Sequence, residues 1–306
     1  GHSFSNYGPL IAGATTLLYE GKPVGTPDAA QFWRLIERHR VKVLVTAPTA
    51  LRGIKRVDEH GLEAKKFDIS TLESLFLVGE RADPDSIKWA EQSLGVPVRD
   101  HWWQTETGWP ITSNLVGFEG HKPVKYGSAF GACPGYDVQI LDDAHEVMPP
   151  GKLGSIAIKL PLPPGVLQSL YNSHARFEES YLKNIPGYYD TGDAGYIDED
   201  GYVFVMSRTD DVMNVAGHRL SSGAMEEVIS DHQDVAEVAV VGVKDALKGQ
   251  TPLGLIVLKN SSNRPHEVIT QVRARTQSHL DYLTNIFFNS NNIFFRVTFS
   301  RRWSNL

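Results

Sequence analysis

The chain has 306 residues, of which 41% are hydrophobic and 22% are charged, as in soluble globular proteins. Its formal net charge of -6 argues against a general nucleic-acid groove, and no apolar run reaches the roughly 20 residues of a membrane span. The single cysteine, Cys133, excludes an internal disulfide and a cysteine metal cluster.

The first hundred residues predict alternating helices and strands. Apolar residues at 29, 32, 33, 35 and 36 have helical spacing, with Asp28 as the expected N-cap. A strand at 41–45 follows, ended by a turn at Pro48, and further strands are expected at 75–78 and 96–98. A helix at 84–94 has Asp83 as its expected N-cap and Pro84 at its first position.

This alternation favours a mainly parallel sheet covered by helices. Ligands of such sheets usually lie in loops beyond the carboxyl ends of the strands. The loops that start at Gly79 and Asp100 are therefore candidate site loops.

The pattern changes at about Gly127, where short strands at 138–141, 155–159 and 202–206 indicate an antiparallel β portion. The polar stretch 207–211 indicates a boundary. A helix at 223–230, strands at 238–243 and 254–258 and a helix at 266–279 then predict a small α+β domain. The expected fold class is thus α/β: part of a large domain at 1–207, a small C-terminal domain at 208–280, and a divergent tail rich in Phe and Asn at 281–306.

Residues 102–108 place two indoles, a hydroxyl and a carboxylate close together. Magnesium on a triphosphate takes one or two carboxylates plus phosphate oxygens, so Glu106 is a candidate ligand and Thr105 a candidate phosphate contact. The alternative is a helix start, in which these two side chains bond free backbone groups.

Asp193 lies in a Thr-Gly-Asp turn expected between two strands, and a carboxylate there could accept hydrogen bonds from both hydroxyls of a ribose. The alternative is a turn residue that bonds its own backbone. Arg208 and Arg219 could meet phosphate, or could be solvated surface cations. Gly79 would let backbone approach a flat ring, and His101 could stack on one or simply be packed.

Five segments together resemble the adenylate-forming superfamily, and most closely its AMP-forming short-chain acyl-CoA synthetases. They are YGPLIAGATTLLYEG at 7–21, TAPTALR at 46–52, DHWWQTETG at 100–108, PGYYDTGDAGYIDEDGY at 186–202 and SRTDDVMNVAGHRL at 207–220. The resemblance extends to about Arg275. VGERAD at 78–83 and LPLPPG at 160–165 favour the propionyl-type branch over the acetyl-type one.

The resemblance implies roles for individual residues. It assigns catalysis to Thr105, Glu106 and Arg219, with Glu106 as the Mg²⁺ ligand. Trp103 would close the acyl pocket, with Val78 on its wall. Nucleotide contacts would come from Gly79, Glu80, Arg81, Asp100, His101, Trp102, Asp193 and Arg208. Asp210 would be the hinge of the small domain, and Ala216 and Gly217 would lie near the CoA arm.

The implied reaction has two steps. A small carboxylic acid, propionate or acetate, attacks ATP with Mg²⁺ to give an acyl adenylate, and the thiol of coenzyme A then displaces AMP. The family's phosphate loop ending in lysine and its C-terminal catalytic lysine have no counterpart in the 306 residues. The chain as written is therefore expected to be inactive.

Two alternatives remain at this point. One is a non-catalytic truncated isoform that binds nucleotide or a partner. The other is a peptide-synthetase adenylation domain, which predicts a carrier-protein domain downstream. The family implies a mitochondrial location for animal propionyl-type enzymes and a cytoplasmic one for bacterial enzymes.

Overall fold

The computed structural model describes residues 2–118, 122–215, 218–245, 249–258, 265–284 and 294–299. The chain divides into two compact units, one ending at Val205 and the other starting at Met206. No helix within the described residues is long and apolar enough to cross a bilayer.

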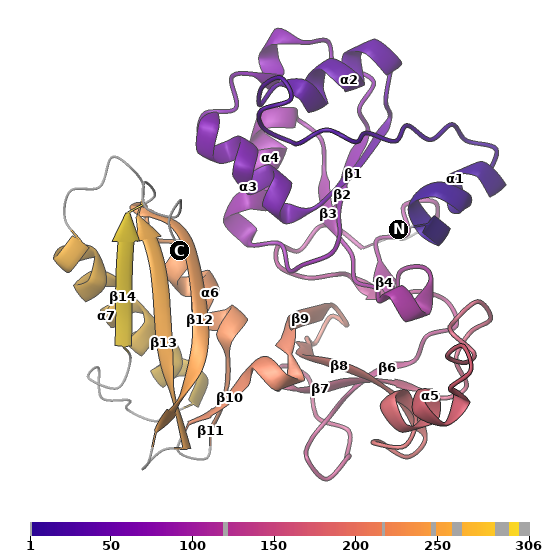
Figure 1. The fold of residues 1–306 in the computed structure, drawn as a ribbon, viewed down its shortest axis with the longest axis vertical. Coiled ribbons are helices and arrows are strands. Elements are labelled where there is room, and N and C mark those ends of the chain that lie inside the picture. The colour runs from indigo at the N-terminus through magenta and orange to yellow at the C-terminus, as the bar shows by residue number, and fades with distance from the viewer. Residues whose placement is uncertain are drawn as a thin grey trace. The chain divides into compact units, whose positions relative to one another are not determined.

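The first unit contains a three-stranded parallel sheet in the order β1-β2-β3 (Figure 1). Its strands are β1 (Val43–Thr46), β2 (Ser74–Leu77) and β3 (Val98–Asp100). The helices that connect them are α2 (Gln31–His39), α3 (Pro48–Val57) and α4 (Pro84–Leu94). The parallel sheet that the sequence predicts is confirmed, and its connecting helices pack on one face.

Two local expectations around the parallel sheet are wrong. Pro48 does not form a turn but begins α3, which fits proline because the first helical position needs no backbone N–H donor. Ala30, not Asp28, occupies the N-cap position of α2, although Asp28 Oδ1 accepts a hydrogen bond from Ala30 N at 2.9 Å. Asp83 caps α4 as predicted, accepting from Ser86 N at 2.7 Å.

Short elements accompany the parallel sheet in the first unit. They are η1 (His2–Tyr7), α1 (Gly8–Ile11), η2 (Ala64–Lys66), η3 (Thr105–Thr107), β4 (Thr112–Ser113) and β5 (Gly131–Ala132). The pair β4 and β5 is antiparallel.

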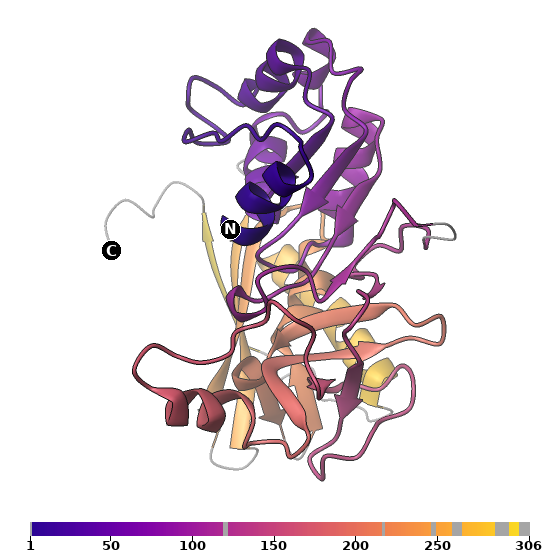
Figure 2. The same ribbon diagram turned by 90° about the vertical axis from the view of Figure 1, so that its right-hand side faces the viewer.

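A four-stranded antiparallel sheet follows in the order β6-β7-β8-β9 (Figure 2). Its strands are β6 (Val138–Leu141), β7 (Gly154–Lys159), β8 (Tyr188–Ile197) and β9 (Val203–Arg208), and α5 (His174–Tyr181) contacts β8. The Thr-Gly-Asp segment is not a turn between two strands. It lies inside β8, where the pairing with β7 shifts at a β-bulge and Gly192 has a φ of 64°.

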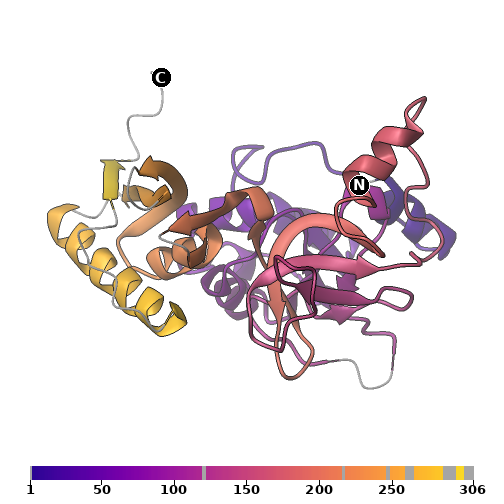
Figure 3. The ribbon, with the colours of Figure 1, turned by 90° about the horizontal axis from the view of Figure 1, so that it is seen from below.

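The second unit is a sheet with two helices (Figure 3). After η4 (Thr209–Asp211) come β10 (Val212–Val215), β11 (His218–Ser221), α6 (Ser222–Ser230), β12 (Val235–Asp245), β13 (Gly249–Leu258), α7 (Pro265–Thr284) and β14 (Phe294–Phe299). Both helices share one core cluster with the sheet, through Met225 and Ile229 of α6 and Val268 and Val272 of α7. The expected tail at 281–306 thus contains the end of α7 and a strand parallel to β13.

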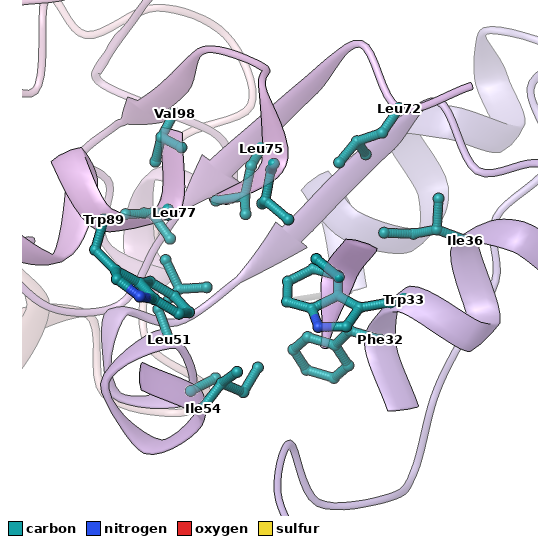
Figure 4. Packing of buried hydrophobic residues seen from close by; sticks show 14 of the residues in the cluster. Phe32, Trp33, Ile36, Leu51, Ile54, Leu72, Leu75, Leu77, Trp89 and Val98 are labelled. Carbon is teal, nitrogen blue, oxygen red and sulfur yellow. The ribbon is translucent and has the colours of Figure 1, made fainter. Parts of the chain in front are cut away.

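Buried apolar side chains from the helices and strands pack against one face of the parallel sheet (Figure 4). Trp33 of α2, Leu51 of α3 and Trp89 of α4 pack against one face of the sheet with Leu75 and Leu77 of β2. Four of these five side chains are at most 1% exposed, and Trp89 is 8% exposed. Burying such a side chain contributes about 1.5–3 kcal/mol, so this packing holds the carboxyl ends of β2 and β3 in place.

Candidate functional site

The loop after β3 is tied back to the body of the first unit. Trp102 N donates to Thr112 O at 3.1 Å, and Thr112 N donates to Trp102 O at 3.1 Å. This bridge closes residues 103–111 into a compact loop. In the middle of the loop Leu167 N donates to Glu106 O at 2.7 Å, so the loop backbone is held both where its ends meet and at its middle.

Within the loop, Thr107 makes the capping contacts of η3. Its Oγ1 accepts from Gln104 N at 3.1 Å and donates to Gln104 O at 2.9 Å. The alternative interpretation, in which Thr105 and Glu106 bond free backbone groups, is therefore not what the structure shows. Thr105 is exposed instead, and the Glu106 carboxylate is available for other contacts.

Glu106 reaches the β-rich part of the unit. Its Oε1 accepts a hydrogen bond from the Tyr181 hydroxyl at 2.8 Å, and no partner for Oε2 is found among the described residues. Those residues contain no group of three His, Cys, Asp or Glu side chains arranged to hold a metal ion. A single half-buried carboxylate fits a cation that brings phosphate oxygens with it, but not a free-standing metal centre.

Asp193 is joined to the same loop. Its Oδ2 accepts from Trp102 Nε1 at 3.1 Å and from Gln104 Nε2 at 2.8 Å, and the carboxylate is 7% exposed. Gln104 Oε1 in turn accepts from the Tyr189 hydroxyl at 3.0 Å. The alternative of a turn residue that only bonds its own backbone is therefore wrong for Asp193.

The two carboxylates are linked through a pair of tyrosines. The rings of Tyr181 and Tyr189 are stacked, with centroids 5.4 Å apart and planes 1° apart. Burial raises the pKa of Tyr189 far above its ordinary value, and the nearby carboxylates Glu106 and Asp193 add to the shift. Its hydroxyl thus stays protonated and remains a donor to Gln104.

Trp103 lies in an aromatic cluster at the other side of the loop. Its indole meets Phe4 edge-on at 4.7 Å between ring centroids and His101 at 5.6 Å. His101 also contacts Phe4 and Phe76, each at 5.6 Å. Trp102, by contrast, is 9% exposed and belongs to the core of the antiparallel sheet.

Asp100 and His101 are both buried at the end of β3. Desolvation raises the pKa of Asp100 to about 7, although its carboxylate accepts from Ala82 N at 3.2 Å and from His101 N at 2.9 Å. Desolvation lowers the pKa of His101 to about 4, with the Leu77 backbone opposing the shift. Neither ring nitrogen of His101 has a partner in hydrogen-bond geometry among the described residues. At pH 7 the imidazole is neutral.

The loop after β2 carries the other predicted nucleotide contacts. Val78 is half-buried, and its N donates to Thr46 O at 3.1 Å. Gly79 has a φ of 103°, which favours glycine. Glu80 Oε1 accepts from Thr49 N at 2.6 Å and from Arg52 Nη2 at 3.0 Å, at the start of α3. Ala82 N, one residue beyond Arg81, donates to Asp100 and so joins the two candidate loops.

The remaining predicted site residues belong to the second unit. Arg208 is exposed at the end of β9, and the backbone of Arg219 pairs with Asn214 in the β10–β11 hairpin. The side chains of Asp210 and Arg219 lie outside the described residues, as do Ala216 and Gly217 altogether. Their roles stay predictions.

Several side chains in these contacts were not predicted as site residues, among them Phe4, Phe76, Gln104, Tyr181 and Tyr189. Gln104 and Tyr189 lie within quoted motifs, so motif membership was a usable signal for them. Tyr181 lies outside every motif, and only the fold brings it to Glu106.

A family model described as "AMP-binding enzyme" matches residues 1–169, and one described as "AMP-binding enzyme C-terminal domain" matches residues 224–289. The chain belongs to the AMP-binding enzyme family. The second match runs beyond Arg275, where the resemblance was expected to stop, and covers the first part of the expected tail.

Curated relatives agree with this assignment. The chain is 55% identical over 262 residues to a protein of Pseudomonas aeruginosa, covering 86% of the chain and 42% of the relative. It is 49% identical over 271 residues to the human mitochondrial acyl-CoA synthetase short-chain family member 3, covering 89% and 40%. It is 43% identical over 266 residues to the propionate–CoA ligase of Escherichia coli, covering 86% and 42%. The chain thus spans about two fifths of the length of these relatives.

Solved structures share the fold. The anthranilate CoA ligase AuaEII in complex with anthranoyl-AMP has a TM-score of 0.74 at 22% identity, over 93% of this chain and 51% of that one. The amide bond synthetase McbA from Marinactinospora thermotolerans has a TM-score of 0.75 at 24% identity, over 94% and 52%. The mixed α/β architecture is therefore that of adenylate-forming enzymes.

Proposed function

We propose that the chain carries the nucleotide-binding and acyl-binding part of an AMP-forming short-chain acid–CoA ligase that acts on propionate or acetate. The observation that carries the proposal is the chain of contacts from Glu106 through Tyr181, Tyr189 and Gln104 to Asp193, in which three hydrogen bonds are joined by the stack of the two tyrosine rings. It gathers, on one scaffold, the two carboxylates to which the family resemblance gives the metal and ribose roles.

The residues around the network support separate roles. Asp193, held by Trp102 and Gln104, would accept hydrogen bonds from the ribose hydroxyls. The exposed Thr105 hydroxyl would bond a phosphate oxygen. Gly79, Glu80, Arg81, Asp100 and His101 would line the adenine side. The roles of Arg208 at the ribose and Arg219 at a phosphate are proposed from the family resemblance alone.

Glu106 would hold Mg²⁺ that arrives with the nucleotide. When bound, the ion neutralises charge on the phosphates. Tyr181 keeps the carboxylate oriented, and the loop backbone is held by the bond from Leu167 N. Holding these groups in place before the substrate arrives is what makes electrostatic stabilisation effective.

Trp103 would limit the acyl group to two or three carbons, with Val78 on the wall of the pocket. Since one methylene is worth about 1–3 kcal/mol in an apolar pocket, acetate and propionate would differ only modestly. The proposed order of domains places the AMP-binding domain at 1–207, the small domain at 208–280 with a hinge at Asp210, and coenzyme A beside Ala216 and Gly217. The proposed location stays conditional: mitochondrial if the chain comes from an animal enzyme like the human relative, and cytoplasmic if it comes from a bacterial one.

The test is the binding of sulfamoyl analogues of acyl adenylates, which need no turnover. We expect the propionyl analogue to bind more tightly than the octanoyl analogue, and Trp103→Gly to bind the octanoyl analogue at least about tenfold more tightly than the unsubstituted chain. Trp109→Gly is the matched control, because this indole is in the same loop but contacts Tyr136, with ring centroids 6.0 Å apart, and not the cluster around Trp103. Failure of every analogue to bind would refute the proposal, and equal binding of both acyl lengths would refute the role of Trp103.

Whether the chain makes acyl adenylate by itself is a separate matter. The expectation of inactivity stays a prediction, as does the alternative of a nucleotide-binding isoform. Exchange of labelled pyrophosphate into ATP in the presence of propionate measures the formation of acyl adenylate directly.

A further inference from the structure

The contact between Tyr181 and Glu106 joins two segments that are 75 positions apart in the chain. Tyr181 is the last residue of α5, and its hydroxyl donates to Glu106 Oε1 at 2.8 Å. A hydrogen bond to a charged oxygen is stronger than one between neutral groups. One of the two carboxylate oxygens is therefore already engaged before any cation binds.

The ring of Tyr181 is held independently of its hydroxyl. It stacks on Tyr189 at 5.4 Å and contacts Phe177, one turn earlier in α5, at 5.6 Å between centroids. Phe177 is 5% exposed, and Tyr189 is fully buried. Removing the hydroxyl alone should leave the ring in place, so the contact with Glu106 can be changed without changing the packing.

An engaged oxygen changes how a carboxylate can bind a metal. Ca²⁺ takes 6–8 oxygen ligands and often uses both oxygens of one carboxylate, whereas Mg²⁺ requires octahedral geometry and keeps several waters. Each carboxylate oxygen has two lone pairs, so a hydroxyl bonded to one oxygen does not block it but competes with a metal for it. This competition disfavours coordination through both oxygens, which penalises Ca²⁺ more than Mg²⁺.

We propose that Tyr181 is a positioning residue that biases Glu106 toward coordination through one oxygen and thereby strengthens the preference of the nucleotide site for Mg²⁺ over Ca²⁺. The inference rests on the proposed function, because it assigns to Glu106 the cation that accompanies ATP. It adds a determinant of metal choice that lies outside all five motifs.

The experiment is a calorimetric titration of the full chain with ATP in saturating Mg²⁺ or Ca²⁺. In the unsubstituted chain we expect tighter binding with Mg²⁺. In Tyr181→Phe the ratio of the two dissociation constants should move toward one by roughly tenfold, the value of one hydrogen bond to a charged group.

Tyr188→Phe is the matched control. Tyr188 directly precedes Tyr189 in β8, and its hydroxyl donates to Gln139 Oε1 at 2.8 Å and not to Glu106. It should keep the metal preference of the unsubstituted chain, and both variants should melt at similar temperatures. A Tyr181→Phe variant that keeps its preference for Mg²⁺, or that melts well below Tyr188→Phe, overturns the inference and leaves the proposed function intact. No ATP binding by the unsubstituted chain with either ion overturns both.

Discussion

His101 shows how a single buried side chain gives the molecule a pH dependence. Its ring is surrounded by Phe4, Phe76 and Trp103, and the pKa is lowered to about 4 from 6.5. Between these pH values the unfolded chain binds a proton that the folded chain does not. The stability that the neutral imidazole contributes is therefore fully present above pH 6.5 and is lost as the pH falls toward 4.

We predict that His101→Phe flattens this loss. Between pH 7 and pH 4.5 the unsubstituted chain should lose on the order of 2–3 kcal/mol more stability than the variant. At pH 7 the variant should be no less stable, because phenylalanine suits the aromatic surroundings and leaves no unpaired ring nitrogen. Urea unfolding at a series of pH values measures both; parallel pH curves for the two proteins would contradict the prediction.

Asp100, next in the chain, acts in the opposite direction. Its pKa is raised from 3.8 to about 7, so between these values the folded chain keeps a proton that the unfolded chain has lost. Stability from this group falls as the pH rises through that window. The two residues thus partly cancel, and comparison with the His101 variant is needed to separate them.

At the scale of elements, glycines mark where helices end and where they continue. Gly95 ends α4 in the left-handed conformation, with a φ of 69° and no atom within 4 Å of an added Cβ. Gly53 lies inside α3, and an added Cβ there would meet only the Val24 side chain at 3.8 Å. The same substitution should therefore have opposite effects at the two positions.

We predict that Gly95→Ala destabilises the chain by about 1 kcal/mol or more, because alanine pays the left-handed strain. Gly53→Ala should stabilise it by about 0.5–1 kcal/mol, since alanine favours a helix interior. Each variant is the control for the other in urea unfolding monitored by circular dichroism. Changes of the same sign in the free energy of unfolding would contradict the left-handed helix end at Gly95.

The sequence predicted some helices and strands of the fold and missed others for physical reasons. The spacing of apolar residues predicted α2, because burial on one face imposes a period, and the capping signals at Asp83 and Pro84 predicted α4. Apolar runs predicted the three strands of the parallel sheet and β6, β7 and β9 of the antiparallel one. The strand β8 was missed because its Thr-Gly-Asp segment was interpreted as a turn. The helix α3 was missed because Pro48 was interpreted as a turn. The bulge at Gly192 was missed because the alternation of apolar and polar residues does not show where the register between β7 and β8 shifts. Tyr181 could not be placed at all, since its partner is set by packing between distant segments.

At the scale of the whole molecule, the first unit exposes a set of apolar side chains on the face of the parallel sheet opposite its core. Val43 and Val45 of the edge strand β1 are 47% and 38% exposed. Their neighbour Leu44 packs against the core on the other face. Parallel sheets usually have both faces covered, so this face is unusual for its class.

We predict that the exposed valines of β1 make the isolated chain bind the dye anilinonaphthalene sulfonate and associate with itself. Lysine at both positions, Val43→Lys with Val45→Lys, should reduce dye fluorescence and shift size-exclusion elution toward the monomer, because charges on an edge strand oppose strand pairing. The control is Val116→Lys, which places a charge on an equally exposed side chain (46%) outside the sheet. It should leave dye binding unchanged. If the control reduced the fluorescence as strongly as the β1 variant, the effect would be due to net charge and not to this edge.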